Sequence, residues 1–175
     1  RLSKGSLGGK GRGLAFINSL FVSMDFDEKF LEMNISLPST AIIGTDEYDC
    51  FIDSNNINEE TLLNKSDKEI DDYFIQSQLT EELVHKLQIL IEKAPYPLAI
   101  RSSGLLEDSY AEPFAGIYRT YMLPNNHPNK SIRLKQLTDA IKLVYASVYN
   151  SKTREYIANM NHQLDEEKMA VIIQQ

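Results

Sequence analysis

The chain has 175 residues, of which 42% are hydrophobic and 25% are charged, and its formal net charge is −7. These values are ordinary for one globular domain with a core of its own. The negative charge argues against a general binder of nucleic acids or anionic membranes, since both need a broad positive field.

Hydrophobic periodicity and capping patterns predict strands and helices that do not alternate strictly. In chain order, the predicted elements are a helix at 11–23, a strand at 38–43, a short helix capped by Thr45, a helix from Ser66 to about Gln78, a helix that begins after Thr80 and ends before Pro95, a strand at 98–100, a loop at 102–115, a strand at 117–122, a helix at 131–149, a short helix at 151–159 capped by Ser151, and a strand at 169–173. This mixture indicates an α+β, or irregular α/β, fold with a mixed sheet flanked by helices.

Cysteine content and hydropathy bear on the compartment. Cys50 is the single cysteine, so the chain can form neither an intrachain disulfide nor a thiolate metal cluster. No signal peptide is found, and no apolar run approaches the roughly 20 residues of a membrane span. We therefore expect a cytoplasmic protein that binds neither nucleic acid nor membrane.

Both ends of the chain look cut. It opens on Arg1 without a methionine and closes on a strand-like run that stops at Gln175. We expect residues 1–175 to be the N-terminal part of a larger protein's domain, truncated at its C-terminal end.

The glycine-rich run Gly8-Gly-Lys-Gly-Arg-Gly13 precedes the first predicted helix. Its spacing matches neither a Walker A loop nor a dinucleotide-binding loop. Glycines before a helix let backbone N–H groups approach an anion, and Lys10 adds a point charge. The alternative interpretation is a flexible turn that starts a helix.

A second cation follows a short apolar strand in Leu98-Ala-Ile-Arg-Ser-Ser-Gly104. An arginine at the end of a strand can hold phosphate oxygens through its fork of donors, and Ser102 and Ser103 add hydroxyls. Equally, Arg101 could pair with Glu107 or Asp108 to order the loop.

Other polar residues give weaker signals. Glu107, Asp108 and Glu112 could bind Mg²⁺ through water or could be solvated loop charges. The three histidines (His85, His127 and His162) have neither metal-ligand spacing nor a serine or cysteine partner nearby, so we assign none of them a catalytic role.

The ordered set of Gly8-Gly-Lys-Gly11 before a helix, a strand with Pro38, Ile100-Arg-Ser-Ser103 with Glu107-Asp108, and Phe114-Ala-Gly116 resembles a known family. It is similar to the N-terminal nucleotide-binding domain of phosphoenolpyruvate synthase and pyruvate phosphate dikinase, with related domains in rifampin phosphotransferase and glucan water dikinase. The resemblance extends from about Gly8 to the terminal strand at 169–174.

The resemblance implies an ATP-grasp-like first subdomain in an ATP-dependent phosphotransferase. Lys10 and Arg101 would face the phosphates of ATP, Arg101 with a catalytic role, and Gly116 and Thr120 would add contacts. The family's second half carries a Glu and a Gln-x-Arg strand that hold Mg²⁺ and phosphate. We expect that half beyond Gln175, together with a phosphohistidine domain, and we assign no metal ligand within 1–175.

The chain departs from the family pattern at Leu105-Leu106, at Ile117 and in an insertion around 54–78. The resemblance implies transfer of a phosphoryl group from ATP, through a histidine on another domain, to pyruvate. One alternative is a degenerate nucleotide-binding regulatory or interaction module without transfer activity. A third interpretation is a plain α+β interaction domain with incidental glycines.

Overall fold

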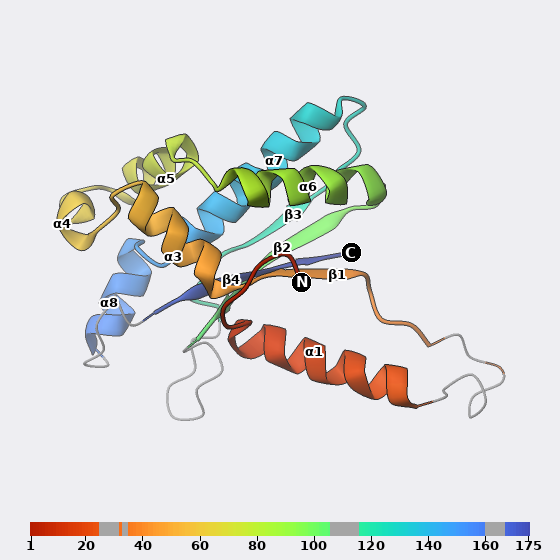
Figure 1. Cartoon of the computed structure of the whole chain (residues 1–175). Helices are drawn as coiled ribbons and strands as arrows, with labels where there is room; N and C mark the ends of the chain where they lie inside the picture. The colour runs from red at the N-terminus through yellow and green to blue at the C-terminus, as the bar shows by residue number, and fades with distance from the viewer. Residues whose placement is uncertain (25–31, 33–34, 106–115, 160–166) are drawn as a thin grey trace.

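A computed structural model describes residues 1–24, 32, 35–105, 116–159 and 167–175. Figure 1 shows the elements in space. They are, in chain order, α1 (Gly8–Ser23), β1 (Thr40–Ile43), α3 (Thr45–Ser54), α4 (Glu59–Leu62), α5 (Asp67–Gln76), α6 (Glu81–Lys93), β2 (Leu98–Gly104), β3 (Thr120–Leu123), α7 (Lys130–Ala146), α8 (Ser151–Asn159) and β4 (Met169–Gln174). The α+β class predicted from the sequence is confirmed.

The strands form one sheet in the order β1-β4-β2-β3. Each pairing in it is antiparallel, with Arg101 of β2 opposite both Thr120 of β3 and Ile172 of β4. The sequence predicted a mixed sheet, so this detail differs. Helices α3–α6 lie between β1 and β2, and α7 and α8 lie between β3 and β4. After such long connections, the sequence pattern alone does not give the direction of the next strand.

The two faces of the sheet have different neighbours. Helices α3 and α7 pack on one face, and α1 lies on the other (Figure 1). Because side chains alternate across a strand, Ile43, Ile100 and Ile173 share the first face, where they are at most 2% exposed. The core therefore lies between the sheet and the layer formed by α3 and α5–α7, in which Phe51, Phe74 and Tyr145 are in ring contact.

Helix caps fix several element boundaries as predicted. The side chains of Ser66 and Glu69 form a capping box at the start of α5, and the Thr80 hydroxyl accepts the Leu83 N–H at the start of α6. Among the described residues, no helix combines the length and the apolar character that crossing a bilayer requires.

Two predicted caps are wrong. Gly44 holds the N-cap position of α3, and the Thr45 hydroxyl instead accepts the Ser6 N–H at 2.9 Å. Before α8, the Asn150 side chain accepts the Thr153 N–H at 2.7 Å, although Ser151 was the predicted cap. In both cases the preceding residue caps the helix, because the predicted hydroxyl has another partner. The Thr45 hydroxyl binds Ser6, and the Ser151 hydroxyl binds Asp67.

Helix α1 begins at Gly8, three residues earlier than predicted, because its first turn packs directly against β2. Gly8 has a φ of +67°, and a Cβ there would overlap the Ser103 carbonyl oxygen. Farther along the helix, a Cβ on Gly13 would meet nothing within 4 Å. Only a glycine therefore fits at the point where α1 reaches the sheet.

We predict that Gly8→Ala lowers the free energy of unfolding by about 2 kcal/mol or more, through left-handed strain and overlap with Ser103. Gly13→Ala is the matched control, and it should raise stability by up to about 1 kcal/mol because alanine favours a helix interior. Urea denaturation of both variants tests this. Equal stabilities for the two would contradict the close packing of Gly8.

Candidate functional site

Arg101 lies inside β2, because this strand extends to Gly104 and includes residues that the sequence assigned to a loop. Alternation places Ala99, Arg101 and Ser103 on the face that carries α1. The Arg101 side chain is half-buried, and its Nη1 donates to the Gln174 Oε1 at 3.2 Å. The described partner of Arg101 is thus a neutral amide on the neighbouring strand.

Thr120 is the direct cross-strand partner of Arg101. Side chains directly opposite each other in an antiparallel pair share one face, with Cβ atoms about 5 Å apart. Thr120 is exposed. The structure therefore brings together a guanidinium and a hydroxyl that are 19 residues apart in the sequence.

Lys10 is held near the same face by the first turn of α1. The buried Ser103 hydroxyl accepts the Gly11 N–H at 3.0 Å and donates to the Leu7 carbonyl oxygen at 2.8 Å. Ser103 is two residues from Arg101 on the same side of β2. Lys10 precedes Gly11 in that turn. The Ser103 contact therefore joins the backbone segments that carry Lys10 and Arg101.

The glycine run differs from its predicted role in one respect. Its N–H groups were expected to face an anion, but the Gly8 N–H donates to the Ser6 hydroxyl at 3.3 Å and the Gly11 N–H donates to Ser103. Ser6 satisfies a donor that the helix N-terminus leaves open, and Ser103 gives the Gly11 N–H an acceptor on the sheet. Gly8 and Gly11 thus serve close packing against the sheet.

Gly116 lies in a turn before β3 with a φ of +75°, and its carbonyl oxygen accepts the Lys152 ammonium group at 3.1 Å. Phe114 and Ala115, the rest of this motif, lie outside the described residues, as do Glu107, Asp108, Glu112 and His162. The predicted pairing of Arg101 with Glu107 or Asp108 therefore stays a prediction.

Gln174 lies beside the candidate site, and the sequence did not single it out. Its Oε1 accepts from Arg101, and its Nε2 donates to the Thr40 hydroxyl at 3.3 Å, which bridges three strands. A cavity of about 350 Å³ adjoins it, open between α1 and β1. The walls combine apolar, polar and charged groups: Arg1, Leu7, Leu14, Ala15, Asn18, Leu37, Pro38, Ser39, Thr40, Ile42 and Gln174. The sequence signal was weak, since a strand-terminal glutamine has no pattern of its own.

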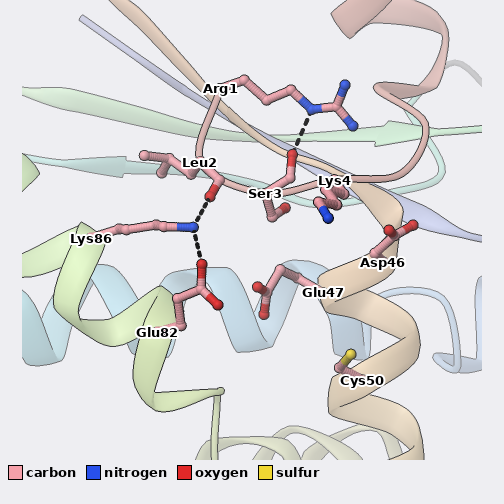
Figure 2. Close-up of a pocket in the computed structure, with 9 residues that line it drawn as sticks. All are labelled: Arg1, Leu2, Ser3, Lys4, Asp46, Glu47, Cys50, Glu82 and Lys86. Carbon is pink, nitrogen blue, oxygen red and sulfur yellow. Dashed lines mark hydrogen bonds and ion pairs between the residues drawn. The ribbon is translucent and has the colours of Figure 1, made fainter.

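A second pocket, shown in Figure 2, lies between the N-terminal segment, α3 and α6. Within it, the Lys86 ammonium donates to the Leu2 carbonyl oxygen at 2.7 Å and to Glu82 at 2.6 Å. The Leu2 N–H also donates to the Ile42 carbonyl oxygen in β1. These contacts fix the segment that leads to Gly8, and none of the candidate site residues lines this pocket.

Within the described ranges, no group of three or more His, Cys, Asp or Glu side chains is placed to hold a metal ion. The side chains gathered on the α1 face of the sheet are instead a guanidinium, a hydroxyl and an amide, next to a helix turn that carries a lysine. Such donors suit an anionic ligand with several oxygens.

An α+β domain with these donors on an open sheet face, beside a glycine-led helix, has the features of a nucleotide-binding domain. Comparison with protein families agrees, since the pyruvate phosphate dikinase AMP/ATP-binding domain matches residues 4–175. The chain belongs to this family and is an ATP-binding domain. No curated protein matches the chain.

We predict that Ser103→Ala lowers the free energy of unfolding by about 1–3 kcal/mol, because it removes the two hydrogen bonds by which the buried Ser103 hydroxyl joins β2 to the first turn of α1. Ser19→Ala, on the same helix, removes an exposed hydroxyl that donates to the Ala15 carbonyl oxygen at 3.0 Å. That control should change stability by less than about 0.5 kcal/mol. A comparable loss in the two variants, measured by chemical denaturation, would contradict the account of Ser103.

Proposed function

We propose that this chain binds the phosphates of ATP on the α1 face of the sheet, in a cytoplasmic phosphotransferase that phosphorylates pyruvate through a histidine on another domain. The observation that carries the proposal is the cross-strand pair of Arg101 and Thr120 beside the Ser103 contact that holds the first turn of α1. The family to which the chain belongs supports ATP as the nucleotide.

Each site residue has a distinct part in this proposal. Arg101 offers a planar fork of donors to two phosphate oxygens, while Lys10 adds a compact charge from the helix turn. The Thr120 hydroxyl donates to a third oxygen, and the Gly116 turn supplies backbone contacts. The cavity beside Gln174 has the mixed lining that the nucleoside part of ATP needs.

Phosphoryl transfer suits this set of residues because it needs positioning and charge neutralisation more than covalent help from the protein. A guanidinium that is already fixed by Gln174 costs less reorganisation when charge develops on the phosphate oxygens. Mg²⁺ would supply further neutralisation when bound, with ligands mainly outside this chain. The described residues offer it no cluster, so we derive no step through it.

The remaining domains of the same polypeptide would complete the reaction: a second ATP-grasp subdomain with the metal ligands and a domain with the phosphorylated histidine. The 175-residue chain alone should therefore transfer no phosphoryl group. This proposal concerns the full-length protein, in which both partners are present.

We predict that Arg101→Ala in the full-length protein abolishes ATP-dependent phosphorylation of the histidine and leaves the fold intact. Removing the guanidinium takes away two charge-assisted hydrogen bonds, which should weaken ATP binding by roughly 100-fold. Arg154→Ala is the control, because Arg154 is half-buried like Arg101 but lies on α8, outside the candidate site, where it donates to the Leu63 carbonyl oxygen at 3.4 Å. Phosphorylation with radiolabelled ATP and calorimetric titration test both variants.

Undiminished phosphorylation in Arg101→Ala would remove Arg101 from the site. ATP binding by the wild-type protein without any transfer would identify the degenerate regulatory module instead.

A further inference from the structure

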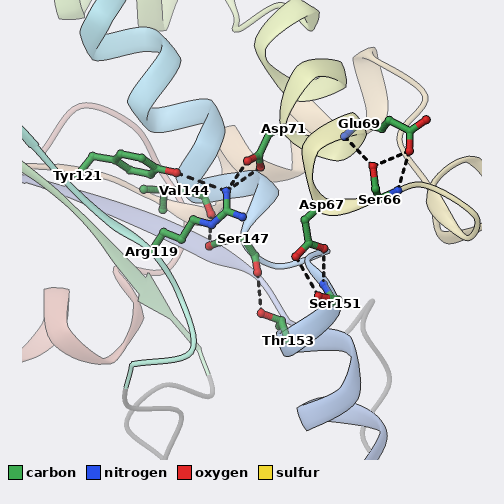
Figure 3. A network of polar contacts seen from close by, with 10 residues as sticks. All are labelled: Ser66, Asp67, Glu69, Asp71, Arg119, Tyr121, Val144, Ser147, Ser151 and Thr153. Atoms are coloured by element: carbon green, nitrogen blue, oxygen red, sulfur yellow. Dashed lines mark hydrogen bonds and ion pairs between the residues drawn. The ribbon is translucent and has the colours of Figure 1, made fainter.

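We propose that α5 and α8 form a latch that positions Gly116 and Thr120 for the phosphates. The latch consists of Asp71 on α5 and Lys152 on α8, which hold Arg119 and Gly116 respectively. This inference rests on the proposed function, and it assigns a positioning role to residues that lie far from the site in the sequence. Figure 3 shows the part of the latch around Asp71 and Arg119.

The first contact joins α5 to the residue before β3. The Arg119 Nη1 lies 2.7 Å from both carboxylate oxygens of Asp71 and 3.4 Å from the Tyr121 hydroxyl. The side chains of the pair are only 29% and 26% exposed. Burial alone would favour the neutral form of Arg119, but the Asp71 contact outweighs it and raises its pKa. The Arg119 guanidinium is therefore bound at both carboxylate oxygens of Asp71.

The second contact joins α8 to the turn before β3, through the 3.1 Å hydrogen bond from the Lys152 ammonium to the Gly116 carbonyl oxygen. Helix α8 is itself tied to α5, because Asp67 accepts the Ser151 N–H at 2.7 Å and the Ser151 hydroxyl at 2.9 Å. Burial opposes ionisation of Asp67, but these two donors prevail and lower its pKa. The two helices therefore act on residues 116–119 as one support.

The position of β3 depends on this support. Among the described strands, β3 lies at the edge of the sheet and pairs with β2 alone, and the ladder begins at the Arg101–Thr120 pair. Residues 116–119 precede the first ladder pair, so side-chain contacts hold them. Since side chains alternate, Arg119 and Tyr121 lie on the opposite face from Thr120. The latch thus fixes Thr120 from behind, without occupying the space in front of it.

Asp67 and Asp71 belong to the segment at 54–78, where the sequence leads us to expect a departure from the family pattern. In the structure this segment forms α4, α5 and their connections. The contact of Asp71 with Arg119, immediately before Thr120, links this segment to the candidate site.

The test measures dissociation constants for ATP and for AMP by calorimetry, on the full-length protein and its Asp71→Asn and Lys152→Met variants. Both variants should weaken ATP binding by roughly 3- to 30-fold, the range of indirect coupling in proteins. AMP binding should change much less, because the β- and γ-phosphates are the groups that Gly116 and Thr120 would contact. A merely structural defect would weaken the binding of ATP and of AMP by similar factors.

The matched control is Asp139→Asn. Asp139 accepts from Lys135 on α7, and its side chain is 25% exposed, close to the value for Asp71. This control should leave the ratio of ATP to AMP affinity unchanged. The charge exchange Asp71→Arg with Arg119→Asp should restore part of the ratio that Asp71→Asn loses, which a loss of folding would not do.

An unchanged ATP to AMP ratio in both latch variants, or an equal loss for the two nucleotides, would overturn the latch. If Arg101→Ala still weakens ATP binding in that case, the proposed function stands and the latch alone fails. Failure of the wild-type protein to bind ATP would overturn the proposed function and the latch with it.

Discussion

The buried contact between Ser103 and the first turn of α1 is the interaction on which the site depends. One hydroxyl accepts from Gly11 and donates to Leu7, and the absent side chain of Gly8 lets the two backbones approach closely enough for this to occur. A larger residue at position 8 would push the helix away from β2. Lys10 would move with it, while Arg101 would stay on the strand.

The two faces of the sheet differ in the side chains that they carry. One face is apolar and covered by α3 and α7, and it supplies the core. The other face is partly covered by α1 and carries Arg101, Thr120 and Gln174. From the first face, Asp71 binds Arg119, the residue that precedes Thr120. We propose that this contact influences a ligand bound on the α1 face.

Sequence reasoning located most of the elements because their signals are local. The capping box at Ser66 and the apolar stripe of α6 are examples. The pairing of Arg101 with Thr120 could not be predicted in this way, because the register of two strands is set by packing over the whole sheet. The same holds for the length of β2, since Ser102 and Ser103 are typical loop residues until a helix turn and a neighbouring strand provide hydrogen-bond partners.

α1 was predictable as a helix but not in its orientation, because apolar residues such as Phe16 and Val22 lie even on its exposed sides, at 65% and 83% exposure. Lys10 and Arg101 could be proposed from the sequence because two cations beside small residues are unusual, whereas Gln174 and Asp71 became candidates only through their contacts.

The central claim is that ATP lies with its phosphates on the α1 face, between the helix turn of Lys10 and the pair formed by Arg101 and Thr120. The most direct measurement is a crystal structure of the full-length protein with a non-hydrolysable ATP analogue. The account predicts phosphate oxygens within hydrogen-bonding distance, about 3 Å, of the Lys10 ammonium and the Arg101 guanidinium. Phosphates bound on the opposite face of the sheet, or more than a water layer away from both cations, would contradict it.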